Sequence, residues 1–151
     1  QGTLDQPVGE GENEIDLPFT VEVTDGDGST ASTTFHISVV DDVPTAIDDS
    51  AGPVEEGQSV SGNVVDANDT VGADGASVTS VEYTDGSGNT VSYTVDPVTG
   101  ATITVDTGVL TIAADGSYTF TTGDDAVTGS ESVFENFTYT LTDGDGDQDT
   151  A

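Results

Sequence analysis

Apolar residues alternate with polar ones along most of the chain, and this pattern constrains the fold more than any other feature. Between residues 15 and 23 every second residue is Ile, Leu, Phe or Val, and the same period returns between 31 and 39. Successive side chains of a strand point to opposite faces, so each run predicts a strand with one apolar face. Further runs of this period span 91–95, 103–105, 110–112, 118–120 and 137–141.

Turn signals separate these runs. Asp-Gly pairs stand at 85–86, 115–116 and 143–144, with Asp-Pro at 96–97 and Thr-Gly at 107–108. Such pairs favour tight turns. The chain holds 25 Thr and 20 Val against 4 Leu, and β-branched residues suit a pleated, half-buried surface. Short strands that recur every ~8 to 12 residues predict an all-β chain folded as an antiparallel β-sandwich.

The charge of the chain excludes several classes of partner. It has 30 Asp and Glu residues, no Lys or Arg and one His, which gives a formal charge of −30 at pH 7. Nucleic acid is excluded, because its affinity comes mainly from Lys and Arg that neutralise phosphates. Anionic membrane surfaces are excluded by the same sign, and no apolar run approaches the ~20 residues that would insert into a bilayer. We also expect no salt bridge between side chains.

The sequence predicts no enzyme. No nucleophile motif or phosphate-binding loop occurs, and the chain has neither Cys nor Trp. The single His36 is predicted to be an exposed strand residue. The four tyrosines are predicted to be core or cross-strand partners rather than a sugar-binding platform; they are Tyr83, Tyr93, Tyr118 and Tyr139.

An internal repeat divides the chain. Residues 19–28 read FTVEVTDGDG and residues 137–146 read FTYTLTDGDG, 118 residues apart and without a gap. This predicts that residues 1–42 are the C-terminal part of a preceding repeat and that 43–151 form a second sandwich. The first copy continues as TTFHISVV over 33–40, whereas the second reaches Ala151 before the equivalent run.

The second sandwich is therefore predicted to lack its final strand. Three sources for that strand stay open: exchange with another copy of the chain, residues 33–40 folding back, or a sequence that is cut there. Between the two units, Pro44 fixes its own φ and holds the preceding residue extended, so the junction over 39–49 is predicted to be short and stiff.

Acidic residues cluster in the predicted turns, where carboxylates crowd together without a counter-charge. Calcium takes about six to eight oxygen ligands and suits such clusters better than magnesium does. We count eight strands between residue 45 and Asp143, and an even number of passes returns the chain to the same end. Loops 66–76, 96–100, 114–116 and 143–149 should then share one end of the sandwich with the junction.

The sequence thus predicts a calcium site that locks the junction. Its predicted ligands, with two that would face a preceding repeat, are Asp25, Asp27, Asp41, Asp42, Asp48, Asp69, Asp143, Asp145 and Asp147. The alternative interpretation of these clusters is solvated surface charge on a halophilic or marine protein.

Several longer motifs resemble a known family. They are VVDDVPTAIDDS at the junction, GNVVDANDTVGADGASVTSV over 62–81, GVLTIAADGSYTFT over 108–121 and FTYTLTDGDGDQDTA at 137–151. Together they make residues 12–151 similar to the cadherin-like or VCBS-type repeats of large bacterial RTX adhesins. The resemblance implies an immunoglobulin-like sandwich, calcium at and near the junctions between repeats, and type I secretion to the bacterial cell surface. The chain departs from the family pattern at both ends, where the repeats are incomplete.

The function that we expect is structural. Each sandwich would be a calcium-stabilised spacer, in contact with adjacent repeats of the same chain, that holds a ligand-binding tip away from the cell. The alternative is a ligand-binding module, or a split scaffold domain, next to the adhesive tip. A third interpretation is a halophilic surface-layer domain whose acids serve only hydration.

Overall fold

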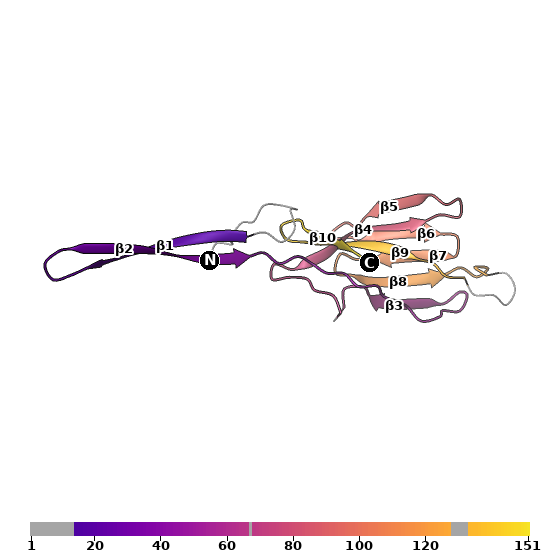
Figure 1. The fold of residues 1–151 in the computed structure, drawn as a ribbon. Helices are drawn as coiled ribbons and strands as arrows, with labels where there is room; N and C mark the ends of the chain where they lie inside the picture. The colour runs from indigo at the N-terminus through magenta and orange to yellow at the C-terminus, as the bar shows by residue number, and fades with distance from the viewer. Residues whose placement is uncertain (1–13, 67, 128–132) are drawn as a thin grey trace.

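The structure, a computed structural model, describes residues 14–66, 68–127 and 133–151 and contains ten strands there (Figure 1). None of these residues lies in a helix, and no candidate for a membrane-spanning helix is found among them. The prediction of an all-β chain is confirmed. The strands are β1 (Glu14–Thr24), β2 (Thr30–Val40), β3 (Ser59–Asn63), β4 (Ala76–Thr84), β5 (Thr90–Thr94), β6 (Ala101–Val105), β7 (Gly108–Ile112), β8 (Ser117–Thr122), β9 (Phe137–Asp143) and β10 (Gln148–Thr150).

Eight strands form two antiparallel sheets that pack as a sandwich. One sheet has the order β10-β9-β4-β5 and the other β3-β8-β7-β6. The chain passes from the first sheet to the second after β5, where Asp96 and Gly100 form an isolated antiparallel bridge. The predicted antiparallel sandwich is confirmed, since every pair of neighbouring strands is antiparallel.

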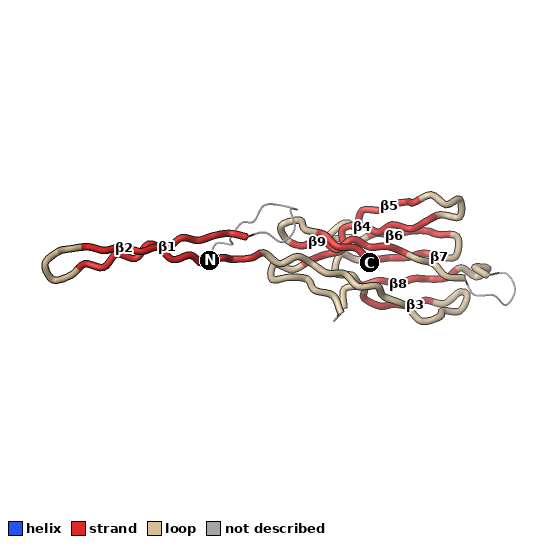
Figure 2. Tube along the Cα trace, in the orientation of Figure 1, coloured by secondary structure: helices blue, strands red, loops and turns tan. Residues whose placement is uncertain are grey.

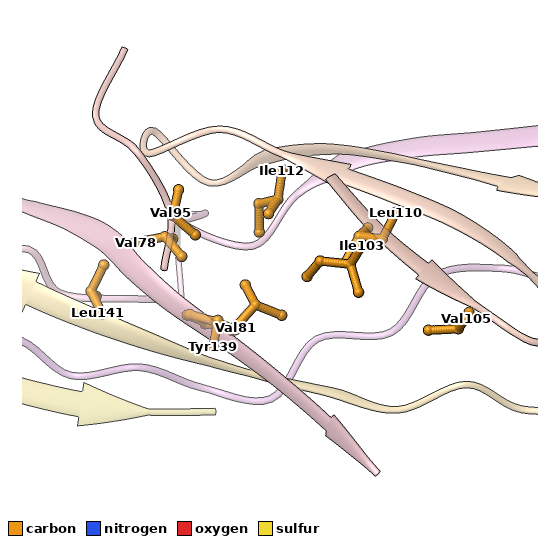
Figure 3. Packing of buried hydrophobic residues seen from close by; sticks show 9 residues of the cluster. All are labelled: Val78, Val81, Val95, Ile103, Val105, Leu110, Ile112, Tyr139 and Leu141. Carbon is orange, nitrogen blue, oxygen red and sulfur yellow. The ribbon is translucent and has the colours of Figure 1, made fainter. Parts of the chain in front are cut away.

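Most of the core consists of apolar residues that alternation placed on one face of a strand, but Val78 and Val81 of β4, on either side of a shift in register, were not among them. Nine buried residues form a single cluster between the sheets, shown in Figure 3: Val78, Val81, Val95, Ile103, Val105, Leu110, Ile112, Tyr139 and Leu141. Ile103 and Leu141 have no solvent exposure. Tyr83, Tyr93 and Tyr118 are partly buried against this cluster, so the prediction that the tyrosines belong to the core is confirmed.

The predicted count of eight strands before Asp143 is wrong. Seven regular strands, β3 to β9, lie between residue 45 and that end of β9. The remaining pass is made by the segment 46–58, which Figure 2 draws as loop. Its first amides, at Ala46 and Ile47, donate to carboxylates instead of to a neighbouring strand, and Pro53 has no amide hydrogen to donate.

This segment still travels from one end of the sandwich to the other. Thr45 pairs with Thr70 at the junction end, and the Gly57 amide donates to the Gly123 carbonyl at the far end. The number of passes is therefore even, as expected. Loops 66–76 and 143–149 accordingly lie at the same end as the junction.

Strands β1 and β2 form a long hairpin that extends away from the sandwich (Figure 1). They pair over eleven residues each, and no other strand of the described chain contacts them. Phe19 stacks on Phe35 with ring centroids 5.4 Å apart, yet both rings are about half exposed. The hairpin therefore presents an apolar face that no other strand among the described residues covers.

The only histidine lies on this hairpin. His36 is exposed, as predicted, and its Nδ1 lies 2.7 Å from Oδ2 of Asp16, on the opposite strand. The expectation of no salt bridge between side chains did not consider this histidine, whose contact with Asp16 is an ion pair only when His36 is protonated. Both side chains are more than half exposed, so this pair contributes little to stability.

The internal repeat is reproduced in the backbone. Thr24 pairs with Thr30 in the first hairpin, and Thr142 pairs with Gln148 at the equivalent positions of β9 and β10. Residues 33–40 belong to β2 and pair with β1, so they do not fold back to complete the sandwich. That source for a final strand is excluded in this structure.

Candidate metal centre at the junction

The junction that follows β2 is held against the sandwich by a row of hydrogen bonds. Thr45 and Thr70 exchange two backbone hydrogen bonds of 2.9 and 3.0 Å. The Ala46 amide donates to Oδ2 of Asp149 at 2.9 Å, and the Ile47 amide donates to Oδ1 of Asp69 at the same distance. These contacts hold residues 45–47 against the sandwich, and the stiffness expected from Pro44 stays a prediction.

Asp42 adds a further contact from the junction side. Its Oδ2 accepts a hydrogen bond of 2.7 Å from the amide of Ala73. The acceptor therefore fastens the 72–75 loop to the junction. The Asp42 side chain thus connects the junction to the backbone of this loop.

Two groups of carboxylates meet where the junction, the 72–75 loop and the β9–β10 turn converge. One group contains Asp41, Asp145 and Asp147; the other contains Asp74, Asp143 and Asp145. Within each group the ligand oxygens all lie within 4.8 Å of one another, and Asp145 belongs to both. Four of the predicted ligands, Asp41, Asp143, Asp145 and Asp147, are thus brought together.

Burial of these carboxylates in their charged form costs free energy. Asp143 is 8% exposed and Asp147 is 4% exposed. Buried oxygens without a hydrogen-bond partner are found on Asp41 (Oδ2), Asp143 (Oδ2) and Asp145 (Oδ1). A buried charge is normally paired or bound to a metal, and the sequence contains no Lys or Arg that could pair with it. The counter-charge must therefore come from outside the chain or from protons.

The carboxyl pKa values respond to this crowding. Burial raises the pKa of Asp143, and its contact with Asp145 raises it further, against the lowering effect of two backbone amides. Burial also raises the pKa of Asp145, and the nearby Asp41 carboxylate adds to the shift. In the equivalent turn of the first hairpin the pKa of Asp27 is lowered instead, because Asp25 and Ser29 hydrogen-bond to it in an exposed loop. The same Asp-Gly-Asp-Gly motif thus has opposite electrostatics in its two copies.

The β9–β10 turn is shaped to hold the cluster. Oδ1 of Asp143 accepts hydrogen bonds from the amides of Gly146 at 2.9 Å and Asp147 at 2.7 Å. Gly146 has a φ of 104°, a conformation that side chains other than glycine rarely adopt. A Cβ at Gly144 would overlap with the carboxylate of Asp74. The two glycines therefore let the turn close and let Asp74 approach it.

The remaining predicted ligands lie elsewhere. Asp69 accepts hydrogen bonds from the amides of Ile47 and Asp66, and Asp48 belongs to neither carboxylate group. Asp25 and Asp27 bond to amides of their own turn at the tip of the β1–β2 hairpin. Their predicted role facing a preceding repeat stays a prediction.

Sequence reasoning missed Asp74. The residue lies within the GADG segment of the 66–76 loop, which was expected at this end of the sandwich. A run of acidic residues around Asp74 would have drawn attention to it. The residue instead stands alone between Ala73 and Gly75. Position in the loop, rather than local acidity, was the available signal.

The donor set favours a hard divalent cation. Every side chain in the two groups supplies carboxylate oxygen, and calcium is bound by about six to eight such oxygens, carbonyls and waters at about 2.3–2.6 Å. Transition metals usually take nitrogen or sulfur ligands, which neither group contains. The residues present fit calcium, and waters would complete its coordination.

A second acidic patch surrounds a buried tyrosine. The Tyr139 hydroxyl donates to the carbonyl of Val64 at 3.0 Å. Burial raises the pKa of Tyr139 to about 12, and the nearby Asp69 and Asp49 carboxylates contribute to the shift. The tyrosine is therefore neutral in the folded state at pH values where a free tyrosine would ionise.

Tyr139→Phe is expected to destabilise the sandwich by about 1–2 kcal/mol at pH 7, because the Val64 carbonyl loses its donor. The pH response should also change. Between about pH 10 and 12 the unfolded state releases the Tyr139 proton and the folded state keeps it, so the stability of the wild type falls as pH rises. Urea unfolding at pH 7, 10 and 11 measures both effects. A variant that loses stability with pH as steeply as the wild type would contradict the assignment.

Two four-stranded antiparallel sheets around one core, with loops gathered at the ends, define an immunoglobulin-like β-sandwich. The family model of the bacterial Ig domain matches residues 41–151, well over half of the chain. The chain therefore belongs to the bacterial Ig domain family. The match begins at Asp41, the first residue after β2. No curated protein matches the sequence. Domains of this family often occur in surface proteins and are typically not enzymes.

Proposed function

We propose that the chain is a calcium-stabilised extender repeat of a bacterial surface adhesin, exported by a type I system and used to hold a ligand-binding tip away from the cell. The observation that carries this proposal is the pair of carboxylate groups at the junction. Asp41, Asp143 and Asp145 each have one buried oxygen without a hydrogen-bond partner there, and the sequence has no Lys or Arg to neutralise them.

The position of Asp41 gives the proposed ion a mechanical role. Asp41 directly follows the last residue of β2, whereas Asp145 and Asp147 belong to the turn that links β9 to β10. A cation held by all three would join the end of the hairpin to the body of the sandwich. The hydrogen bonds made by Asp42 and by residues 45–47 would then hold the rest of the junction against the sandwich.

The hairpin is proposed to be the last part of a preceding sandwich, with residues 1–42 in that unit and 43–151 in the next. Phe19, Val21 and Val23 of β1 correspond, 118 residues on, to core-facing residues of β9. The equivalent residues of β9 pack in or against the core, whereas those of β1 are exposed. An isolated two-stranded hairpin is marginally stable in water, so this face suits burial against further strands of its own repeat.

Export fits the same chemistry. In a cytosol with little free calcium, charge repulsion among the carboxylates would oppose compact folding. Outside the cell, calcium binding would add directly to the free energy of folding. Secretion would then be coupled to folding by the calcium gradient.

Small-angle scattering of the chain with calcium and with chelator tests the junction. Calcium is expected to narrow the distribution of hairpin orientations, seen as a sharper maximum dimension, because Asp41 becomes fixed to the turn. Asp41→Asn should remove that response while circular dichroism still reports the sandwich. Identical scattering profiles with and without calcium would reject the proposed locking role.

A further inference from the structure

A hollow of about 300 Å³ opens to solvent on the outer face of the β3-β8-β7-β6 sheet, at the end where β6 begins, β7 ends and β8 begins (Figure 1). We infer that this hollow binds one neutral sugar residue. Its lining residues lie within 99–102, 111–113 and 117–119, and its volume is at the lower end of the range for small-ligand sites. The site would act independently of the carboxylate groups at the junction, so it adds a binding role to the proposed extender.

A row of threonines crosses the hollow. Thr102, Thr111 and Thr119 are paired with one another across β6, β7 and β8, and all three line the hollow. Their neighbours Ile103 and Phe120 belong to the core or pack against it. Because successive side chains of a strand point to opposite faces, the threonines point away from the core. The hollow is therefore lined by hydroxyl and methyl groups on the solvent side of the sheet.

The charge of the lining argues for an uncharged ligand. None of the described residues that line the hollow is charged, although 20% of the chain is acidic. The nearest acids along the chain are bound to their own turns: Asp96 accepts from the amides of Val98 and Thr99, and Asp115 accepts from the amide of Ser117. A cation site would be lined by carboxylates, and an anion site would need the Lys or Arg that the chain lacks.

The hydroxyl groups of the lining offer acceptors. A hydroxyl has one hydrogen to donate and two lone pairs. Thr111 already donates to the carbonyl of Thr119 at 3.2 Å, and Ser117 donates to the carboxylate of Asp115. Since these hydrogens are committed, the ligand must bring donors of its own. Sugar hydroxyls are uncharged donors, and the C–H groups of a sugar ring suit the methyl groups of the lining.

Both rims of the hollow are held in place by the fold. The crossover from β5 to β6 is closed by two backbone hydrogen bonds between Asp96 and Gly100, of 2.8 and 3.3 Å. A Cβ at Gly100 would overlap with the carbonyl of Ile112, so the glycine lets this crossover lie against β7. In the turn from β7 to β8, the amide of Ala113 donates to the carbonyl of Ser117 at 2.9 Å. A preformed site loses less conformational entropy when a ligand binds.

Thr102 and Thr104 provide a matched pair of variants. Thr102 lines the hollow, is exposed, and makes no side-chain hydrogen bond to the residues that the structure describes. Thr104 lies two residues further along β6 on the same face and is also exposed, but it does not line the hollow. Replacement by valine removes the hydroxyl and keeps the branched shape that suits a strand. Both variants should therefore fold, and only one should affect the ligand.

An NMR titration of the isotope-labelled chain in calcium tests the site. The probes are glucose, galactose and mannose, each also as its methyl glycoside. At least one of them is expected to shift the amide signals of residues 99–102, 111–113 and 117–119. Thr102→Val should weaken that binding about fivefold, the usual contribution of one neutral hydrogen bond, and Thr104→Val should bind as the wild type does. Binding of a methyl glycoside would support a residue within a longer glycan as the ligand, and binding of the free sugar alone would support a free sugar.

Three results would overturn the inference. The first is that no probe shifts these amides, and the second is that Thr102→Val and Thr104→Val weaken binding equally. Ethanolamine, a small cation with a hydroxyl group, gives the third: a shift of the same amides by ethanolamine and not by the sugars would mean that the hollow attracts cations. All three leave the calcium response of the junction untouched, so the sugar site and the proposed function fail separately.

Discussion

Calcium is expected to raise the thermal unfolding midpoint of the sandwich by roughly 10 °C, and sodium chloride at equal ionic strength should give a much smaller rise. A ligand present at a hundredfold excess over its Kd stabilises the folded state by about 2.7 kcal/mol per site, and a domain of this size gains about 4 °C per kcal/mol. Salt screens the repulsion among exposed carboxylates, but it does not supply a divalent cation to the buried oxygens of Asp143 and Asp145. Differential scanning calorimetry in chelator, calcium and sodium measures the difference.

Asp143→Asn provides the control for this result, because the variant and the wild type should exchange their order of stability between chelator and calcium. In chelator the variant is expected to be more stable than the wild type, since an amide replaces a buried carboxylate that has one unpartnered oxygen. With calcium it should be less stable than the wild type, because a charged ligand is lost. Equal stabilisation by calcium and by sodium in the wild type would favour the interpretation that the acids serve only hydration.

Leu141→Ala is expected to destabilise the sandwich by about 2–5 kcal/mol, the usual cost of truncating a fully buried leucine. Leu141 has no solvent exposure and pairs with Val78 of β4. Its equivalent in the first repeat, Val23, is 64% exposed, so Val23→Ala should cost less than about 0.5 kcal/mol. Urea unfolding in saturating calcium compares the two variants.

The pair of variants tests the organisation of the chain as well as its core. Similar losses from Val23→Ala and Leu141→Ala would mean that the hairpin packs on the sandwich in solution, against the structure. A large loss of stability from Leu141→Ala alone would support a hairpin whose apolar face is exposed and free to pack against other strands. An unchanged m-value in both variants would confirm that stability, and not compactness, has changed.

Alternation predicted most of the core, because the period of a strand fixes the face of each side chain. Leu141 and Ile103 followed directly from it. It missed Val78 and Val81, which an irregularity in β4 sets three residues apart. The repeat at residues 19 and 137 even gave equivalent hairpins with the same register. What alternation does not report is whether a run finds a partner, so the face of β1 that contains Phe19 looked like core and is exposed.

The acidic site was less predictable than the core. The even number of passes placed the right loops together and brought Asp41 to Asp145. It did not say which acids of those loops would gather, since Asp42 and Asp69 accept backbone hydrogen bonds and belong to neither carboxylate group. Asp74 became visible only when the approach of two loops was known, because its role depends on the missing side chain at Gly144.

The direction of the chain at the junction bears on how the protein responds to pulling. The segment after Thr45 runs along the sandwich away from the hairpin, and β10 also leads away from that end, antiparallel to β9. Tension between the hairpin and β10 would load the Thr45–Thr70 and Ala46–Asp149 bonds in shear, so that they must break together and not one after another. Repeats joined in this way would resist tension at their joints.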